Sequence, residues 1–187
     1  MNNLTKHILI ICLLFFFCGF NSYKVNCQQY NYFQIDSAIS AKFEGKPVKT
    51  FCHSALGDVT SFKYESNNNS KKTNYICEIS IYKNIKSVPL DTKNADFLKF
   101  IVSSEEMSIL EQNGKILEKK DSAILSHPGL LYKVYFQKIK DEKSKGWINH
   151  ILYFKHNDNV IKLSTFVPKK SDGSITKAFF SSVKINP

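Results

Sequence analysis

Histidine is the side chain of this sequence best suited to hold a metal ion or to act as a general base. Beyond residue 27 the histidines are His53, His127, His150 and His156. Zinc and hydrolytic sites usually place histidines at short fixed spacings or beside clustered carboxylates, a pattern that these residues do not follow. His150 and His156 are expected on one face of a strand but about 20 Å apart, since a strand rises roughly 3.3 Å per residue. We therefore expect no metal site.

Nucleophilic and acid–base signatures are equally sparse. The chain has seven glycines and no Gly-x-Ser-x-Gly elbow or phosphate-binding glycine loop. Its adjacent acids, Glu105-Glu106 and Asp141-Glu142, are neighbours on one element and do not form an acid/base pair across a cleft. We therefore expect no catalytic residue, no cofactor and no enzymatic activity. The alternative is a site that the fold assembles from scattered residues, among them Cys52 and His53.

The five cysteines divide into three within the first 27 residues and two beyond them, Cys52 and Cys77. In an exported protein the last two are expected to form a disulfide. Such a bridge closes a loop of about 25 residues and contributes roughly 3 kcal/mol in the chain-entropy treatment. The alternative is a pair of buried free thiols. The absence of a Cys-x-x-Cys spacing argues against thiol redox chemistry.

Residues 1–27 indicate export. Lys6 precedes an apolar run over residues 8–20, which is shorter than the roughly 20 residues of a membrane-spanning helix. Val25 and Cys27 place small side chains where signal peptidase needs them, so we expect a signal peptide cleaved after Cys27. The alternatives are lipidation of Cys18 or an uncleaved anchor, and only these predict contact with a membrane. The expected location is the periplasm, the cell surface or the exterior.

The formal net charge is +10, and all the basic residues counted in it are lysines, because the sequence contains no arginine. Arginine is the residue preferred for bidentate contacts to phosphates and bases, so its absence argues against specific nucleic-acid recognition. We interpret the lysines as a solvated surface. An acidic polysaccharide or a lipid headgroup is the alternative partner that this charge indicates.

Hydrophobic periodicity predicts one α+β domain over residues 38–187, preceded by a leader over residues 28–37. The strands expected from alternation and turn signals cover residues 38–43, 48–53, 59–64, 75–82, 115–125, 130–138, 147–156 and 160–167. The spacing over residues 94–112 predicts one long mid-chain helix or two shorter ones, ended by Asn113-Gly114. A C-terminal helix, capped by Asp172 or Ser174, is expected to pack onto an antiparallel sheet.

The strands over residues 147–167 also predict which side chains share a face. Those expected to face the core together are Ile148, Leu152, Phe154, Ile161, Leu163 and Val167. Trp147 and Tyr153 fall on the other face, where Tyr135 from the preceding strand is expected to join them. If helices cover both faces, these aromatics are core residues. If one face is open, they form a platform for a sugar or another ligand.

Three short motifs carry a resemblance to a known fold. They are Ala41-Lys42-Phe43-Glu44-Gly45-Lys46-Pro47, Pro128-Gly129 before a strand, and Phe179-Phe180-Ser181-Ser182-Val183 in the last helix. With the order of elements over residues 38–185, they resemble the PsbP-like fold of an extrinsic photosystem subunit, a Ran-binding nuclear import factor and many small exported bacterial domains. Glu44 stands where the bacterial members usually have proline, and Val183 where they have phenylalanine. The resemblance implies an α/β/α sandwich but no functional residues, because one fold hosts unrelated activities.

These observations together predict an exported, non-enzymatic domain that binds a macromolecular partner. The prediction depends on a complete fold that lacks a catalytic constellation in its sequence. The alternative is a carrier of a small ligand or lipid, held in a pocket between a helix and the sheet.

Overall fold

A computed structural model of the chain describes residues 31–54, 57–66, 74–85, 94–137 and 146–186. The expected signal peptide, its cleavage site and Cys18 lie outside these residues, as does the acid pair Asp141-Glu142. No helix in the described part of the chain is both long and apolar enough to cross a membrane.

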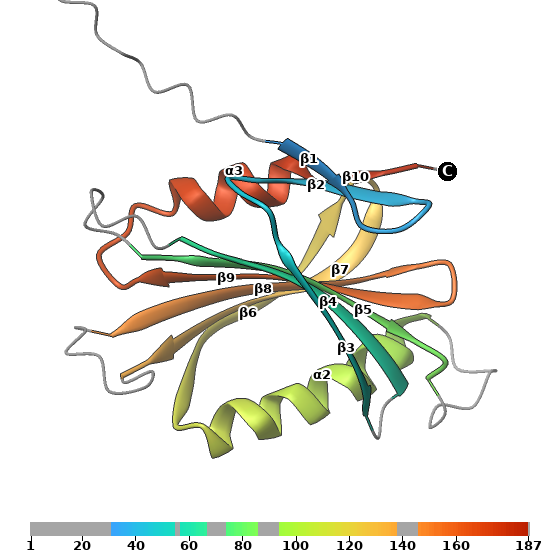
Figure 1. Cartoon of the computed structure of the whole chain (residues 1–187). Helices are drawn as coiled ribbons and strands as arrows, with labels where there is room; N and C mark the ends of the chain where they lie inside the picture. The colour runs from blue at the N-terminus through green and yellow to red at the C-terminus, as the bar shows by residue number, and fades with distance from the viewer. Residues whose placement is uncertain (1–30, 55–56, 67–73, 86–93, 138–145, 187) are drawn as a thin grey trace, which may run out of the picture.

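The main sheet has seven antiparallel strands in the order β3-β4-β5-β9-β8-β7-β6 (Figure 1). Their bounds are β3 Val48–Ser54, β4 Gly57–Glu65, β5 Ile76–Lys83, β6 Gly114–Ile124, β7 His127–Phe136, β8 Trp147–His156 and β9 Asn159–Pro168. Strands that are neighbours in the sheet are also neighbours in the chain, except β5 and β9. The sheet therefore consists of two meanders joined edge to edge at β5 and β9.

A second, three-stranded sheet brings both ends of the domain together. It contains β1 Asn31–Gln34, β2 Ile39–Phe43 and β10 Lys184–Ile185, in the order β1-β2-β10. Both outer strands run antiparallel to β2. Residues 31–34, which the sequence assigned to a leader, thus form a strand of the fold, because β2 offers them an edge with which to pair.

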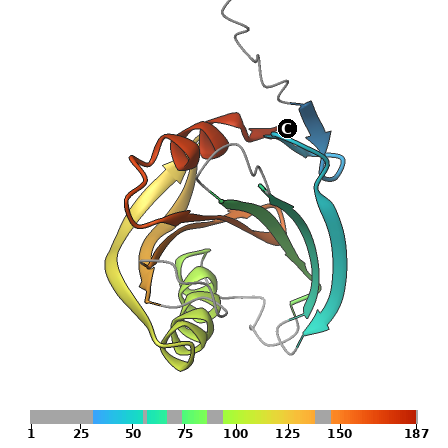
Figure 2. The same ribbon diagram turned by 60° about the vertical axis from the view of Figure 1, so that its left-hand side comes forward.

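Helices α2 and α3 lie against opposite faces of the main sheet. Helix α3, Ser174–Ser182, packs on the face that also carries the small sheet, and helix α2, Asn94–Glu111, lies on the other (Figure 1). Figure 2 shows the sheet bending around α2. Asn113 follows α2 with a φ of 57°, as the expected Asn-Gly stop requires. Asp172 accepts a hydrogen bond of 2.9 Å from the backbone N–H of Ser174 where α3 begins.

Each face of the sheet has its own apolar core. The α3 face buries the six side chains that the sequence assigned to one side of β8 and β9, together with Phe179 and Val183 of the C-terminal segment. Ile175 and Phe180 pack against the same core and are partly buried. The α2 face buries a second cluster that includes Tyr132, Ile151 and Tyr153. The alternation predicted from the sequence is confirmed for both strands.

Polar contacts hold the described side chains of α2 to the sheet. Glu105 pairs with Lys162 of β9. Glu106 accepts a hydrogen bond of 2.6 Å from Lys119 of β6 and one of 2.7 Å from the hydroxyl of Tyr132. Ile109 is the apolar side chain of α2 that enters the core, at 5% exposure, among the residues described. The described side chains of α2 are thus held to the sheet by Glu105, Glu106 and Ile109.

Candidate functional site: a pocket between α3 and β2

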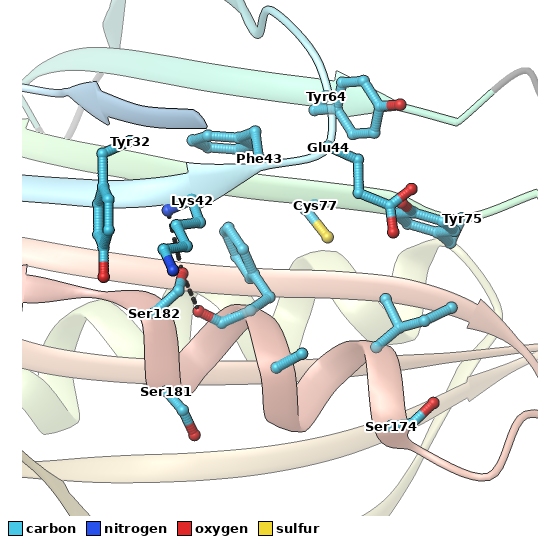
Figure 3. Close-up of a pocket in the computed structure, with 13 residues that line it drawn as sticks. Tyr32, Lys42, Phe43, Glu44, Tyr64, Tyr75, Cys77, Ser174, Ser181 and Ser182 are labelled. Carbon is cyan, nitrogen blue, oxygen red and sulfur yellow. Dashed lines mark hydrogen bonds between the residues drawn. The ribbon is translucent and has the colours of Figure 1, made fainter. Parts of the chain in front are cut away.

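A pocket of about 430 Å³ lies between α3 and strand β2, with the ends of β4 and β5 behind it (Figure 3). Its lining residues are Tyr32, Lys42, Phe43, Glu44, Tyr64, Tyr75, Cys77, Ser174, Ile175, Ala178, Phe179, Ser181 and Ser182. They come from the small sheet, the main sheet and α3, so the pocket exists only where these elements meet. Its size falls in the range of small-molecule sites.

Buried aromatic side chains form the floor of the pocket. Phe43 of β2 and Phe179 of α3 are 2% and 5% exposed, and their ring centroids lie 5.3 Å apart. Ser182 fixes the two walls relative to each other, because its hydroxyl accepts a 3.1 Å hydrogen bond from the backbone N–H of Lys42 and donates one of 2.7 Å to the carbonyl of Phe179 (Figure 3). The floor is therefore apolar and well packed.

One end of the pocket combines a carboxylate with two tyrosines. The rings of Tyr64 and Tyr75 have centroids 6.1 Å apart, and the Glu44 carboxylate lies beside the Tyr75 hydroxyl (Figure 3). Tyr75 is only 6% exposed, and its hydroxyl completes no hydrogen bond of normal geometry within the described part of the chain. Burial, followed by a hydrogen-bonding contact with Glu44 and by the charge of Glu44, raises the pKa of Tyr75 far above its ordinary value, so the hydroxyl is neutral.

The buried thiol of Cys77 lies at the same end. Burial, with a further contribution from the Glu44 charge, raises its pKa to about 12. A thiol with so high a pKa is protonated at neutral pH and is not a nucleophile. Cys77 therefore contributes apolar surface to the pocket rather than chemistry.

The opposite end of the pocket is positively charged. The ammonium groups of Lys42 and Lys184 lie 4.7 and 4.3 Å from the centroid of the Tyr32 ring. These distances are within the range of cation–π interactions. The pocket is thus polarised, with lysines at the Tyr32 end and a carboxylate at the Tyr75 end.

The aromatic platform expected from the sequence does not form. Residues paired across antiparallel strands share a face, and Tyr135 pairs with Ile148 rather than with Trp147. Tyr135 therefore lies on the α3 face, while Trp147 and Tyr153 lie on the α2 face. Trp147 and Tyr153 are also buried, at 7% and 1% exposure, which makes them core residues. The platform hypothesis is wrong.

The expected Cys52–Cys77 disulfide is also wrong for this fold. Both thiols are free, Cys52 on the surface and Cys77 in the core. Cys52 pairs with Val59 of β4, which in turn pairs with Tyr82 of β5. Positions 77 and 82 are about 16 Å apart along β5, beyond the Cα separation of about 7 Å that a disulfide allows.

The structure brings two of the four histidines together. The rings of His127 and His156 approach to 3.1 Å between Nε2 and Nδ1, at the ends of neighbouring strands. His53 instead contacts Asp58 at 2.6 Å on the surface. No group of three or more potential metal-ligating side chains occurs within the described ranges. The sequence alone could not predict this histidine pair. The β7–β8 register is needed, because it brings positions 127 and 156 opposite each other.

Sequence reasoning did not find the pocket residues. They come from three distant segments, residues 32–44, 64–77 and 174–182, and no local spacing connects them. The motif over residues 41–47 and the last helix contain two walls of the pocket, but in the sequence they indicated only a fold and not a binding site. The sequence offered no signal for Tyr75, whose position is fixed by a 2.9 Å hydrogen bond from the backbone N–H of Ser66 to its carbonyl oxygen.

No protein-family model and no curated protein sequence matches the chain. Solved structures do resemble it. A protein of unknown function from Pseudomonas aeruginosa is 12% identical, with a TM-score of 0.42, over 79% of this chain and 88% of its own. A protein from Bacteroides thetaiotaomicron is 13% identical, with a TM-score of 0.43, over 80% of this chain and 45% of its own.

The cyanobacterial PsbP protein (CyanoP) from Synechocystis sp. PCC 6803 is similar along most of the chain. It is 10% identical, with a TM-score of 0.51, and the match covers 87% of this chain and 95% of that one. At such low identity the likeness concerns the backbone arrangement alone. The order of the elements and this likeness show that the chain has the PsbP-like fold.

Proposed function

We propose that this PsbP-like domain is an exported, non-enzymatic binding protein that carries a small ligand in the pocket between α3 and β2. A carrier needs an enclosed, mainly apolar site with a few polar groups that orient its ligand. The pocket has an apolar floor of Phe43 and Phe179 and a buried polar group in Tyr75. This arrangement favours carriage over the macromolecular partner that the sequence alone predicted.

The observation that carries the proposal is the Tyr75 hydroxyl. It lines the pocket, is buried, and completes no normal hydrogen bond to a described residue. The Glu44 carboxylate lies within reach of this hydroxyl without forming a hydrogen bond of full geometry to it. A polar group of a ligand that bonds to both would be oriented by this pair, as a binding site requires.

The rest of the domain fits the same role. We propose an α/β/α sandwich in which the long mid-chain helix α2 covers one face of the sheet and leaves the α3 face to the ligand. Residues 1–27 support export as a signal peptide, and the proposed location is the periplasm, the cell surface or the exterior. Nucleic acid is not among the proposed partners, since the chain lacks arginine.

The proposal is tested by mass spectrometry under native conditions on protein purified from its own host. We expect a co-purifying small molecule on the wild type and on Lys177→Trp, and none on Ala178→Trp. Ala178 lines the pocket, whereas Lys177 is an exposed neighbour on α3 outside it, so the second variant controls for a tryptophan added to the helix. A wild type that is consistently empty, and that also binds no apolar probe, would refute the proposal.

A macromolecular partner is the second candidate, and the edge of the main sheet favours it. Strand β3 is an outermost strand, and its Val48 and Phe51 side chains are 65% and 58% exposed. An exposed strand edge with apolar side chains can pair with an extended segment of another protein. A photo-crosslinker at position 51 should then capture one partner in the host, and a crosslinker at Leu125, exposed on a distant turn, should not. Equal labelling at both positions would argue against this role.

A further inference from the structure

We infer that the ligand of the pocket carries a protonated amine on a compact apolar body, with the amine held between the Glu44 carboxylate and the Tyr75 hydroxyl. The inference rests on the proposed function and specifies its ligand class. It follows from three features of one end of the pocket: a buried hydroxyl, a negative charge and two aromatic rings.

The first feature is the Tyr75 hydroxyl, which lies beside the Glu44 carboxylate and can bond to a polar group of the ligand. Its residue is 6% exposed, and its oxygen completes no normal hydrogen bond with the described residues. A phenolic oxygen accepts as well as donates, and an ammonium group offers three donors. One N–H of an amine can therefore reach Tyr75 while another reaches Glu44.

The second feature is the charge of Glu44. Burial is the largest cause of the raised pKa of Tyr64 and of Cys77, and the charge of Glu44 is the next largest. The field of this carboxylate therefore reaches across this end of the pocket. A carboxylate has two oxygens with about four acceptor positions, so it can bind a ligand in addition to any neighbour in the protein. This field attracts a cation and repels an acid.

The third feature is the pair of rings. Tyr64 and Tyr75 are tilted by 56° with centroids 6.1 Å apart, and both line the pocket. Aromatic faces attract ammonium groups, and the protein itself uses this contact where Lys42 and Lys184 meet Tyr32. Because lysines occupy the Tyr32 end, a cationic ligand is directed to the Tyr75 end.

The apolar body of the ligand would then lie on the floor of the pocket. Phe43 and Phe179 separate the two charged ends, and Ala178 and Ile175 of α3 complete the wall. The expected ligand is therefore an arylalkyl or short alkyl amine. A fatty acid, whose carboxylate would face Glu44, is disfavoured.

The test compares three probes of matched size by isothermal titration calorimetry near neutral pH: phenethylamine, phenethyl alcohol and phenylacetate. We expect phenethylamine to bind about tenfold more tightly than the alcohol, and phenylacetate to bind weakest. Glu44→Gln should remove the preference for the amine, because it should weaken binding of the charged amine far more than binding of the alcohol. Tyr75→Phe should weaken amine binding, and Glu118→Gln, an exposed carboxylate on β6, should change nothing.

The outcomes separate the inference from the function on which it rests. If the alcohol or the acid binds best, or if Glu44→Gln retains the amine preference, the inference is wrong and the carrier function stands. If no probe binds and the protein from its host is empty, both fail. If Glu44→Gln does not fold, the Tyr75→Phe variant tests the inference instead. The inference is overturned if Tyr75→Phe prefers the amine as strongly as the wild type does.

Discussion

Two buried tyrosines on the α2 face offer a direct test of the contacts between this helix and the sheet. Tyr132 and Tyr153 are each 1% exposed, and their rings contact each other with centroids 6.3 Å apart. The Tyr132 hydroxyl donates a 2.7 Å hydrogen bond to Glu106. The Tyr153 hydroxyl lies near the Glu105 carboxylate, which pairs with Lys162, but it completes no hydrogen bond of normal geometry among the described residues. We predict that removing these two hydroxyls has opposite effects on stability.

The magnitudes follow from the type of bond. A hydrogen bond to a charged acceptor contributes about 1.5–3 kcal/mol, so Tyr132→Phe should lower the free energy of unfolding by about 2 kcal/mol. Removing a buried hydroxyl that lacks a partner relieves a desolvation cost, so Tyr153→Phe should raise that free energy by about 1 kcal/mol. For a chain of this length, each kcal/mol shifts Tm by about 2–4 °C.

Urea denaturation followed by the fluorescence of Trp147, the only tryptophan in the chain, measures both changes. The midpoint should fall for Tyr132→Phe and rise for Tyr153→Phe, with equal slopes. In a Glu106→Gln background, the loss caused by Tyr132→Phe should shrink, since the charged acceptor is gone. If both single variants lose stability equally, the assignment of one satisfied and one unsatisfied hydroxyl is refuted.

Three further predictions follow from the structure. In protein beginning at Gln28, iodoacetamide should label the surface thiol Cys52 quickly and the buried thiol Cys77 only after unfolding, as peptide mapping would show; equal labelling would contradict the burial of Cys77. The hydrogen bond from Lys119 lowers the pKa of Glu106, so its stabilisation is present above the unfolded pKa of about 4.3 and is lost as pH falls below it. Urea midpoints measured between about pH 5 and pH 3 should therefore fall more steeply for the wild type than for Glu106→Gln. Gly129→Ala should cost about 1–3 kcal/mol in thermal unfolding, because a Cβ there would lie 2.3 Å from the Tyr153 carbonyl oxygen.

The sequence was a reliable guide to the faces of individual strands. In β8 the alternation of Ile148, Leu152 and Phe154 predicted one buried face, and all three are buried on the α3 side. The period of two residues is a property of the strand itself, so it can be read locally. The end of α2 was equally local, as the positive φ of Asn113 shows.

Relations between strands were not readable in the same way. Tyr135 was expected on the same face as Trp147, but the β7–β8 register pairs it with Ile148 and therefore places it on the other face. The same lack of register information led to the wrong disulfide. The pocket escaped prediction for a related reason, because Tyr75 and Phe179 meet only through the packing of the whole domain.

The pocket also has a consequence for synthesis of the protein. The hydrogen bond between Lys42 and Ser182, which joins its two walls, spans 140 positions of the chain. A ribosome adds about 5–20 residues per second, so roughly 7–28 s separate the emergence of the first wall from that of the second. During that interval the Phe43 side chain cannot pack against Phe179, which has not yet been synthesised. The nascent chain should consequently depend most on a holding chaperone just before its last helix is made.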